Sequence, residues 1–328
     1  MSRRGAVLFA AMGVIWGIPY LLIKVADGGV SVPVLVWARV TVGALILVPV
    51  ALAQGAWRPE PRAALRRHWR WLLAYAVIEI IGPWALLSTA ERHLSSSTSG
   101  LLIASVPAIG ALLTWLVARR GGLFADSDRL TAVRVAGLAL GFAGVALLAG
   151  PGAGRGDLVS DALVLLTALG YAAGPMIANR KLADVPSIRA NAVCLVIAAV
   201  AYTPVAVLTW PHAAPSARVL AALVALGAVC TAAGLVGYFW LIAEVGAARA
   251  TVVTYLNPAV AVALGAVILG ERLTPITGVS FVLILAGSVL ATRAPAGISL
   301  SSGRRRNQTR PSAPARETSP DTGLRPRQ

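Results

Sequence analysis

Ten long apolar blocks follow one another along the chain, and their length restricts the fold more than any other feature. A helix needs about 20 mostly apolar residues to cross the hydrocarbon core of a bilayer. The connections between the blocks are short and carry Gly, Pro, Ser or Arg. We therefore expect an all-α integral membrane protein with ten transmembrane helices, at about residues 5–24, 32–54, 69–89, 96–118, 131–149, 157–178, 189–210, 218–241, 249–269 and 274–292.

The composition agrees with a chain that is solvated mainly by lipid. Hydrophobic residues make up 57% of the chain and charged residues 13%, whereas soluble domains average about 45–50% and 25%. The net charge of +16 would suit a nucleic-acid partner, but no basic stretch alternates with aromatic residues to form a groove for a strand. We expect no nucleic-acid partner.

The basic residues are divided unequally between the two sides of the predicted bundle. If the N-terminus is cytoplasmic, the cytoplasmic connections hold fifteen Lys and Arg residues before residue 293, and the outer connections hold four. Cytoplasmic loops carry an excess of basic residues, so we expect both termini in the cytoplasm. Residues 293–328 lose all hydrophobic periodicity and are rich in Pro, Ser and Arg, which predicts a disordered basic cytoplasmic tail.

The chain also repeats itself. The stretch DRLTAVRVAGLALGFAGVALL from Asp128 resembles ERLTPITGVSFVLILAGSVLA from Glu271, and the Pro-Ala pair at Pro107 recurs at Pro258. A repeat of five helices, an odd number, must enter the membrane from the opposite side in its second copy. Inverted repeats are a recurring device of secondary transporters, with the substrate site near the midplane between them. We expect one repeat at 5–150 and an inverted copy at 157–292.

Three segments carry a resemblance to a known family: VIWGIPYLLIK, PVLVWARVTVGALIL and LNPAVAVALGAVILGERLTPITGVSFVLILAGSVL. Over nearly the whole of residues 5–292 the chain resembles the EamA-type transporters of the drug/metabolite transporter superfamily. The resemblance implies a multi-pass protein of the bacterial inner membrane that exports small metabolites, amino acids or toxic compounds, with helices 5 and 10 at the periphery. The first repeat departs from the pattern, because Asp128 stands where the second has Glu271.

Two charged residues lie inside predicted spans. Glu79 is in the middle of LLAYAVIEIIGPWALL, where a charge costs about 2.5–3.5 kcal/mol on insertion scales. Loss of water favours the neutral form of a carboxyl group, so Glu79 could couple transport to protons or bind a substrate cation; the alternative is a hydrogen bond to Ser or Thr on a neighbouring helix. Arg39 could pair with Glu79, bind an anionic substrate group, or snorkel outward.

Helix-breaking and aromatic residues complete the predicted site. Proline removes a backbone donor, and matched breaks in two repeats point to a transporter's substrate site; packing kinks are the alternative. We expect the site to include Pro107, Tyr255, Asn257 and Pro258 together with the aromatic residues Trp16, Tyr20 and Trp84. Other candidates for cavity aromatics are Tyr171, Tyr238 and Trp240, while Trp57, Trp69, Trp71, Trp115 and Trp210 suit the interfacial belts.

Several features receive plainer interpretations. The motifs at Gly13 and Gly137 (G-x-x-x-G) allow close helix contact within the bundle. A homodimer contact through the helix that contains Gly137 is the alternative. Glu271 is expected to be a solvated loop acid. The histidines fall in three separate connections and both cysteines lie in apolar blocks, so no metal site and no cofactor are expected.

The sequence favours a secondary transporter, with small molecules and membrane lipid as its partners and protons as a candidate coupling ion. A lipid or lipid-linked-sugar translocator remains an alternative, since an inverted repeat suits it as well. A membrane-embedded enzyme is a further alternative, but the chain contains no HExxH motif, nucleophile elbow or P-loop.

Overall fold

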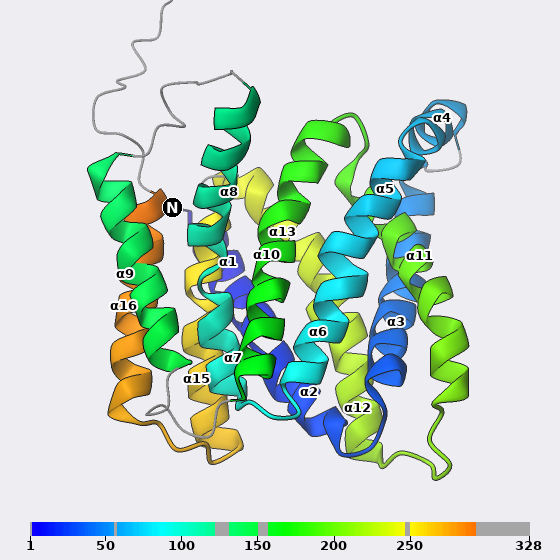
Figure 1. The fold of residues 1–328 in the computed structure, drawn as a ribbon. Coiled ribbons are helices and arrows are strands. Elements are labelled where there is room, and N and C mark those ends of the chain that lie inside the picture. The colour runs from blue at the N-terminus through cyan, green and yellow to red at the C-terminus, as the bar shows by residue number, and fades with distance from the viewer. Residues whose placement is uncertain (1, 56–57, 122–130, 150–156, 247–249, 293–328) are drawn as a thin grey trace, which may run out of the picture. The chain divides into compact units, whose positions relative to one another are not determined.

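The computed structural model describes residues 2–55, 58–121, 131–149, 157–246 and 250–292, and within these ranges all regular structure is helical (Figure 1). The predicted tail at 293–328 lies outside the described residues. Nine helical segments in the described ranges are long and apolar enough to cross a membrane. They are α1–α2 (Arg3–Gly17, Pro19–Asp27), α3 (Val32–Ala53), α5–η1–α6 (Trp69–Tyr75, Ala76–Ile81, Gly82–Ala90), α7–α8 (Ser96–Ile103, Val106–Gly121), α10 (Leu158–Lys181), α11 (Ser187–Leu208), α12–η3–α13 (Ala217–Ala225, Leu226–Ala233, Gly234–Val245), η4–α15 (Thr251–Tyr255, Asn257–Ile268) and α16 (Pro275–Thr292).

Two further helices complete the described chain. The block expected at 131–149 forms α9 (Ala132–Leu148), which is apolar but, at 17 residues, shorter than the other nine. A short helix, α4 (Pro59–Arg67), occupies what the sequence suggested was only a basic connection. Proline suits the first turn of a helix, and Glu60 at its start and Arg67 at its end complement the helix dipole.

Five of the nine spans change helix type or break partway across. α1–α2 and α7–α8 break at Ile18 and at Ala104–Ser105, η1 and η3 are π-helical segments, and η4 is a 3₁₀ turn that precedes α15. Side chains from other helices bind some of the carbonyl groups that these changes release. The Tyr202 hydroxyl on α11 donates to the Ile81 carbonyl (2.6 Å), and Ser288 Oγ on α16 donates to the Ala104 carbonyl (2.9 Å).

The packing partners join the two halves of the chain. α9 packs against α16 at one edge of the bundle (Figure 1), and α3 packs against α11. α1 contacts α13 and α15, while α10 contacts α6 and α8, and α7 contacts α15. The interior between them is filled mainly by one cluster of buried apolar side chains.

Glycines allow α9 and α16 to approach closely. A methyl group added at Gly287 would lie 2.5 Å from Cα of Gly141, and one at Gly144 would lie 2.8 Å from side-chain atoms of Leu283 and Ile284. Gly137 also faces α16, so the Gly137-x-x-x-Gly141 motif is used for packing within the chain. The motif at Gly13 is likewise used within the chain, against η4–α15.

We expect Gly287→Ala to destabilise the protein, because the added methyl group must push α9 away. Overpacking of this kind costs about 1–3 kcal/mol, which should lower the thermal unfolding midpoint of the purified protein. Gly278→Ala on the same helix is the matched control, since a methyl group there meets no atom within 4 Å. Equal midpoints for the two variants would contradict this description of the α9–α16 contact.

Candidate functional site

Arg39 is a charged residue buried in the interior of the bundle, with partners on neighbouring helices. Its side chain extends from α3 into the bundle and is only 6% exposed. The guanidinium carbon lies 3.7 Å from the centre of the Trp84 ring on α6, and Nε donates to the Thr231 hydroxyl on η3 at 3.1 Å. Cation–π contact and a hydrogen bond both offset the cost of burying the charge. Arg39 therefore does not snorkel outward, which was one of the alternatives.

Two tyrosines complete what we call the central polar cluster: Tyr20, Arg39, Trp84, Tyr171 and Thr231. Tyr20 on α2 and Tyr171 on α10 lie within electrostatic range of the guanidinium. The terminal nitrogens of Arg39 form no hydrogen bond with any described residue. A guanidinium presents five donors in a fork that matches a carboxylate, and four of these N–H groups have no partner among the described residues.

Glu79 lies beside this cluster on η1. Its side chain packs against Gly174 on α10, where a methyl group on the glycine would come within 2.9 Å of the Glu79 carboxyl carbon. Oε2 is buried and has no hydrogen-bond partner among the described residues, and the carboxyl interacts electrostatically with Tyr171. The ion pairs between described residues do not include one between Glu79 and Arg39. The carboxyl thus faces a neighbouring helix, and the suggested Ser or Thr partner for Oε2 is not found.

The prolines occupy the first turns of new helical segments. Pro107 begins α8 just after the break at Ala104–Ser105, and Pro258 begins α15 after the 3₁₀ turn. Next to Pro258, the side-chain oxygen of Asn257 is buried without a partner among the described residues. Tyr255 is directed elsewhere, because its hydroxyl interacts with the Ser288 carbonyl (3.2 Å) and the Thr292 hydroxyl (2.9 Å) of α16.

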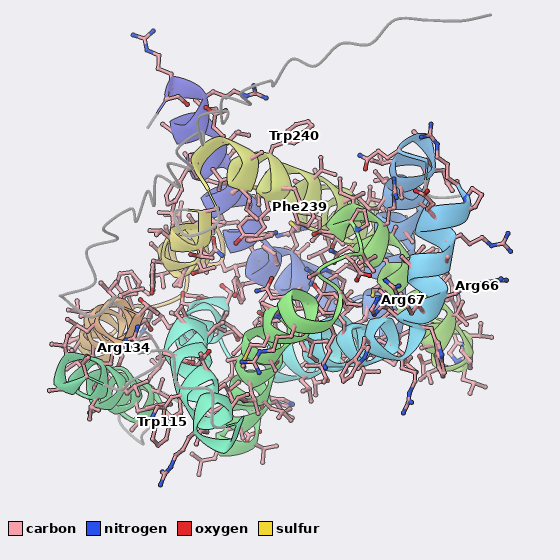
Figure 2. The ribbon with its side chains drawn as sticks, turned by 90° about the horizontal axis from the view of Figure 1, so that it is seen from above. Arg66, Arg67, Trp115, Arg134, Phe239 and Trp240 are labelled. Atoms are coloured by element: carbon pink, nitrogen blue, oxygen red, sulfur yellow. The ribbon has the colours of Figure 1, made fainter. Side chains whose placement is uncertain are left out.

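The remaining aromatic candidates separate into different places. Trp16 packs against Tyr238 in a tilted arrangement, with ring centres 4.7 Å apart, in a small apolar cluster around Met12 and Leu241. It does not join Tyr20 and Trp84 in the central polar cluster. Trp240 is 58% exposed and points away from the bundle (Figure 2), so its interpretation as a cavity aromatic is wrong.

The sequence did not reveal the role of Thr231. One signal was present: the offset of 151 residues between Pro107 and Pro258 places Glu79 opposite Cys230, directly before Thr231. The two π-helical segments therefore carry polar groups at matching places. π-bulges are frequent at functional sites.

A second polar group lies at the other end of α6 and was also missed. Glu91 is fully buried, and neither carboxyl oxygen has a hydrogen-bond partner among the described residues. Burial raises the pKa of Glu91 well above its usual range, and the nearby Lys24 opposes that rise. Beside it, Arg92 forms an ion pair with Asp27 on α2 at 2.7 Å.

Glu271 is not the solvated loop acid that the sequence suggested. Its carboxylate accepts hydrogen bonds from the backbone N–H and hydroxyl groups of Ser96 (2.7 and 2.9 Å) and Ser97 (3.0 Å to the N–H). It thereby satisfies free N–H groups at the start of α7, where a negative charge is favoured. Asp128, its expected counterpart, lies outside the described residues.

At the opposite end of the bundle, one acidic residue fixes the start of α5. Arg67 and His68 both bond to Asp184 in the α10–α11 connection. Slight desolvation of Asp184 works against ionisation, but the hydrogen bonds from Arg67 and His68 outweigh it and lower the pKa of Asp184. Within the described residues, no group of three or more His, Cys, Asp or Glu side chains is arranged to hold a metal ion.

Comparison with known proteins places these features in a family. The model of the EamA-like transporter family matches residues 3–150 and again residues 158–293. The uncharacterized inner membrane transporter YedA of Escherichia coli K12 is 27% identical over 86% of this chain and 88% of its own. A probable terminal-alkyne amino-acid exporter of Streptantibioticus cattleyicolor is 28% identical over 91% of this chain and 94% of its own. A solved crystal structure with 20% identity has a TM-score of 0.61 and covers 89% of this chain and 97% of that one, which supports the fold alone.

The Thr231 hydroxyl can be tested as the partner that holds Arg39. We expect Thr231→Val to leave a buried guanidinium N–H unsatisfied and to lower the free energy of unfolding by about 1–3 kcal/mol. Thr231→Ser retains the hydroxyl and should unfold close to the wild-type temperature. If valine and serine variants unfold at the same temperature, the hydrogen bond contributes nothing.

Proposed function

The chain belongs to the EamA-like transporter family and is a multi-pass membrane transporter, and from this premise we propose that it exports small amino-acid-like molecules by alternating access. The observation that carries the proposal is Arg39, a buried guanidinium whose terminal N–H groups have no partner among the described residues. Such a group at membrane depth binds a carboxylate through two parallel hydrogen bonds. The role that we propose is transport, and we propose no catalytic role for the chain.

A zwitterionic substrate suits the charges around this position. Arg39 would hold the carboxylate, and Glu79, on the neighbouring η1 segment, would hold the ammonium group or a proton. Tyr20, Trp84 and Tyr171 would enclose the substrate's apolar part. The relative named as an amino-acid exporter, at 28% identity, supports this substrate class.

Alternating access rests on two inverted repeats, at 5–150 and 157–292, that rock about the central polar cluster. The two matches of the family model support this division. The helix contacts support it as well. If each of the first five spans is matched to the span five places later, α1 corresponds to α10, α6 to α13 and α8 to α15. The contacts of α1 with α13 and α15 then correspond to the contacts of α10 with α6 and α8. Both repeats break at a matched proline, Pro107 and Pro258.

The sequence and the site also suggest an orientation in the membrane and a driving force. With fifteen basic residues in one set of connections and four in the other, both termini would be cytoplasmic, in the inner membrane. A carboxyl group that gains and loses water as the bundle rocks would bind and release a proton. We assign that coupling step to Glu79.

The coupling role of Glu79 predicts a specific loss. In liposomes with an imposed pH gradient, Glu79→Gln should lower gradient-driven uptake of an amino acid to the level seen without a gradient. Exchange of labelled for unlabelled substrate, which needs no net proton movement, should continue. Glu60→Gln is the matched control, since Glu60 lies on α4 outside the predicted spans. Full gradient-driven uptake by Glu79→Gln would exclude Glu79 from coupling.

The role of Arg39 predicts discrimination between substrates. We expect Arg39→Gln to weaken the binding of an amino acid by roughly 10- to 100-fold, because hydrogen bonds to a charged group contribute about 1.5–3 kcal/mol. Binding of the corresponding amino-acid amide, which lacks the carboxylate, should change little. Exposed Arg218→Gln serves as the control. Equal weakening for acid and amide would show that Arg39 does not bind the carboxylate.

A further inference from the structure

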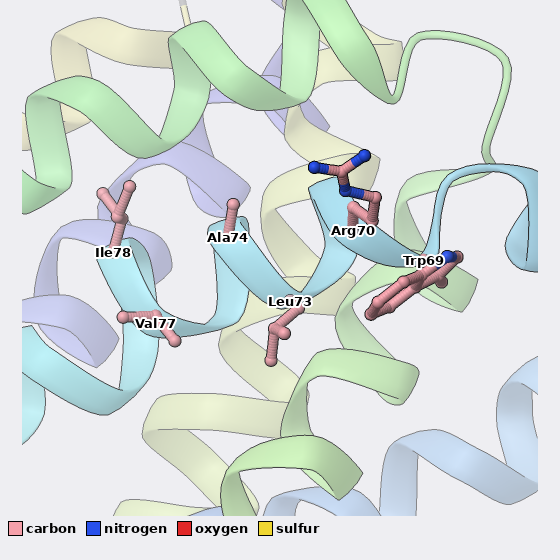
Figure 3. Close-up of a pocket in the computed structure, with 6 residues that line it drawn as sticks. All are labelled: Trp69, Arg70, Leu73, Ala74, Val77 and Ile78. Atoms are coloured by element: carbon pink, nitrogen blue, oxygen red, sulfur yellow. The ribbon is translucent and has the colours of Figure 1, made fainter.

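Two grooves flank α5 on the outer surface of the bundle. One, of about 320 Å³, runs along α5 and η1 from Trp69 and Arg70 past Leu73 and Ala74 to Val77 and Ile78 (Figure 3). The other, of about 400 Å³, lies between α4, α5 and α11. Its floor is apolar, from Leu65, Leu72, Leu73, Val193 and Ile197, and Arg62 and Arg66 stand at its α4 end. The grooves share Trp69 and Leu73 and therefore form one continuous surface.

The polarity of this surface changes in one direction. Arg62, Arg66 and Arg70 lie at the α4 end, where the span begins, and Trp69 between them is 59% exposed. Farther along the span, the exposed side chains of Leu73 and Val77 are apolar. A charged end joined to an apolar groove, with tryptophan at the junction, has the shape of a phospholipid-binding surface at the membrane interface.

The arginines of this surface differ in their availability. The side chains of Arg66 and Arg70 form no ion pair or hydrogen bond with any described residue. Arg67, one residue along, is turned toward the bundle and bound to Asp184 (Figure 2). Arg67 is thus neutralised by Asp184, whereas Arg66 and Arg70 have no acidic partner among the described residues.

We propose that this surface is a binding site for an anionic phospholipid, with the phosphate held by Arg62, Arg66 and Arg70 and the acyl chains lying in the two grooves. The basic connections predict that this end faces the cytoplasm, where anionic lipids attract basic residues next to a span. A second copy of the chain is a poorer occupant, because a two-fold contact through this surface would bring its three arginines near their own counterparts.

The test uses the full-length protein purified in detergent. Native mass spectrometry would measure retention of dioleoylphosphatidylglycerol and of dioleoylphosphatidylcholine, which have the same acyl chains and differ in charge. The variant R62Q/R66Q/R70Q removes the arginines of the site. The control R3Q/R4Q/R218Q removes the same charge from exposed positions away from the grooves. Ala74→Trp fills the groove along α5 without changing any charge, and glycerol 3-phosphate supplies a soluble phosphate without acyl chains.

We expect the wild-type protein and the control variant to retain the anionic lipid in preference to the neutral one. Each basic side chain contributes about a factor of five near an anionic headgroup, so R62Q/R66Q/R70Q should weaken binding on the order of 100-fold. Ala74→Trp should also weaken it, and added salt should do so in the wild type. Equal retention of the two lipids, an equal loss in the control variant, or displacement of the lipid by glycerol 3-phosphate would each overturn the proposal.

Discussion

The absence of water in the hydrocarbon core is the constraint on which the rest of this structure depends. A backbone carbonyl that loses its helical partner there must find another donor, since none is available from solvent. The chain meets this demand with hydroxyl groups from other helices, as Tyr202 does at the Ile81 carbonyl and Ser288 at the Ala104 carbonyl. At these two interruptions the hydrogen bond is also a contact between helices distant in sequence, and it ties local irregularity to the arrangement of the bundle.

The same constraint explains why three ionisable residues of the bundle have different surroundings. Arg39 cannot lose its proton, so it is surrounded by a ring face and a hydroxyl acceptor. Glu79 and Glu91 are carboxyl groups, which can become neutral, and both have buried oxygens without partners among the described residues. A permanent cation is stabilised in place, whereas carboxyl groups can be left without partners. This asymmetry is what a binding group beside a proton-accepting group requires.

The sequence predicted the positions of the spans well, because span length and hydrophobicity are local properties. It also predicted the breaks near Pro107 and Pro258, because proline acts on its own backbone. It did not predict η1 and η3, since a π-helical turn depends on tertiary partners that no short window contains. α4 was missed because four of its nine residues are charged, which favoured the interpretation as a connection. α9 is shorter than the block that predicted it.

The direction of side chains was the least predictable property of the site. Trp16, Tyr20 and Trp84 were all expected to line one cavity. In the structure Trp84 contacts Arg39, Tyr20 lies within electrostatic range of it, and Trp16 packs against Tyr238. Residues four apart, such as Trp16 and Tyr20, lie on the same face of a continuous helix. The break at Ile18 between α1 and α2 separates them here, and its geometry does not follow from a local pattern. Glu271 shows the same limit, because its contact with Ser96 and Ser97 exists only once spans far apart in sequence have assembled.

The α5–η1 segment connects the two surfaces to which we assign functions. Val77 and Ile78 line the groove on its outer face, while Glu79, the next residue, faces α10 and Tyr171. In a π-helix each backbone hydrogen bond joins residues five apart, and in an α-helix residues four apart. A change between the two forms would therefore rotate the residues that follow the segment. An acyl chain against Val77 and Ile78 would pack on the residues directly before Glu79. Lipid bound outside and a proton bound inside would then act on one helical segment from its two faces.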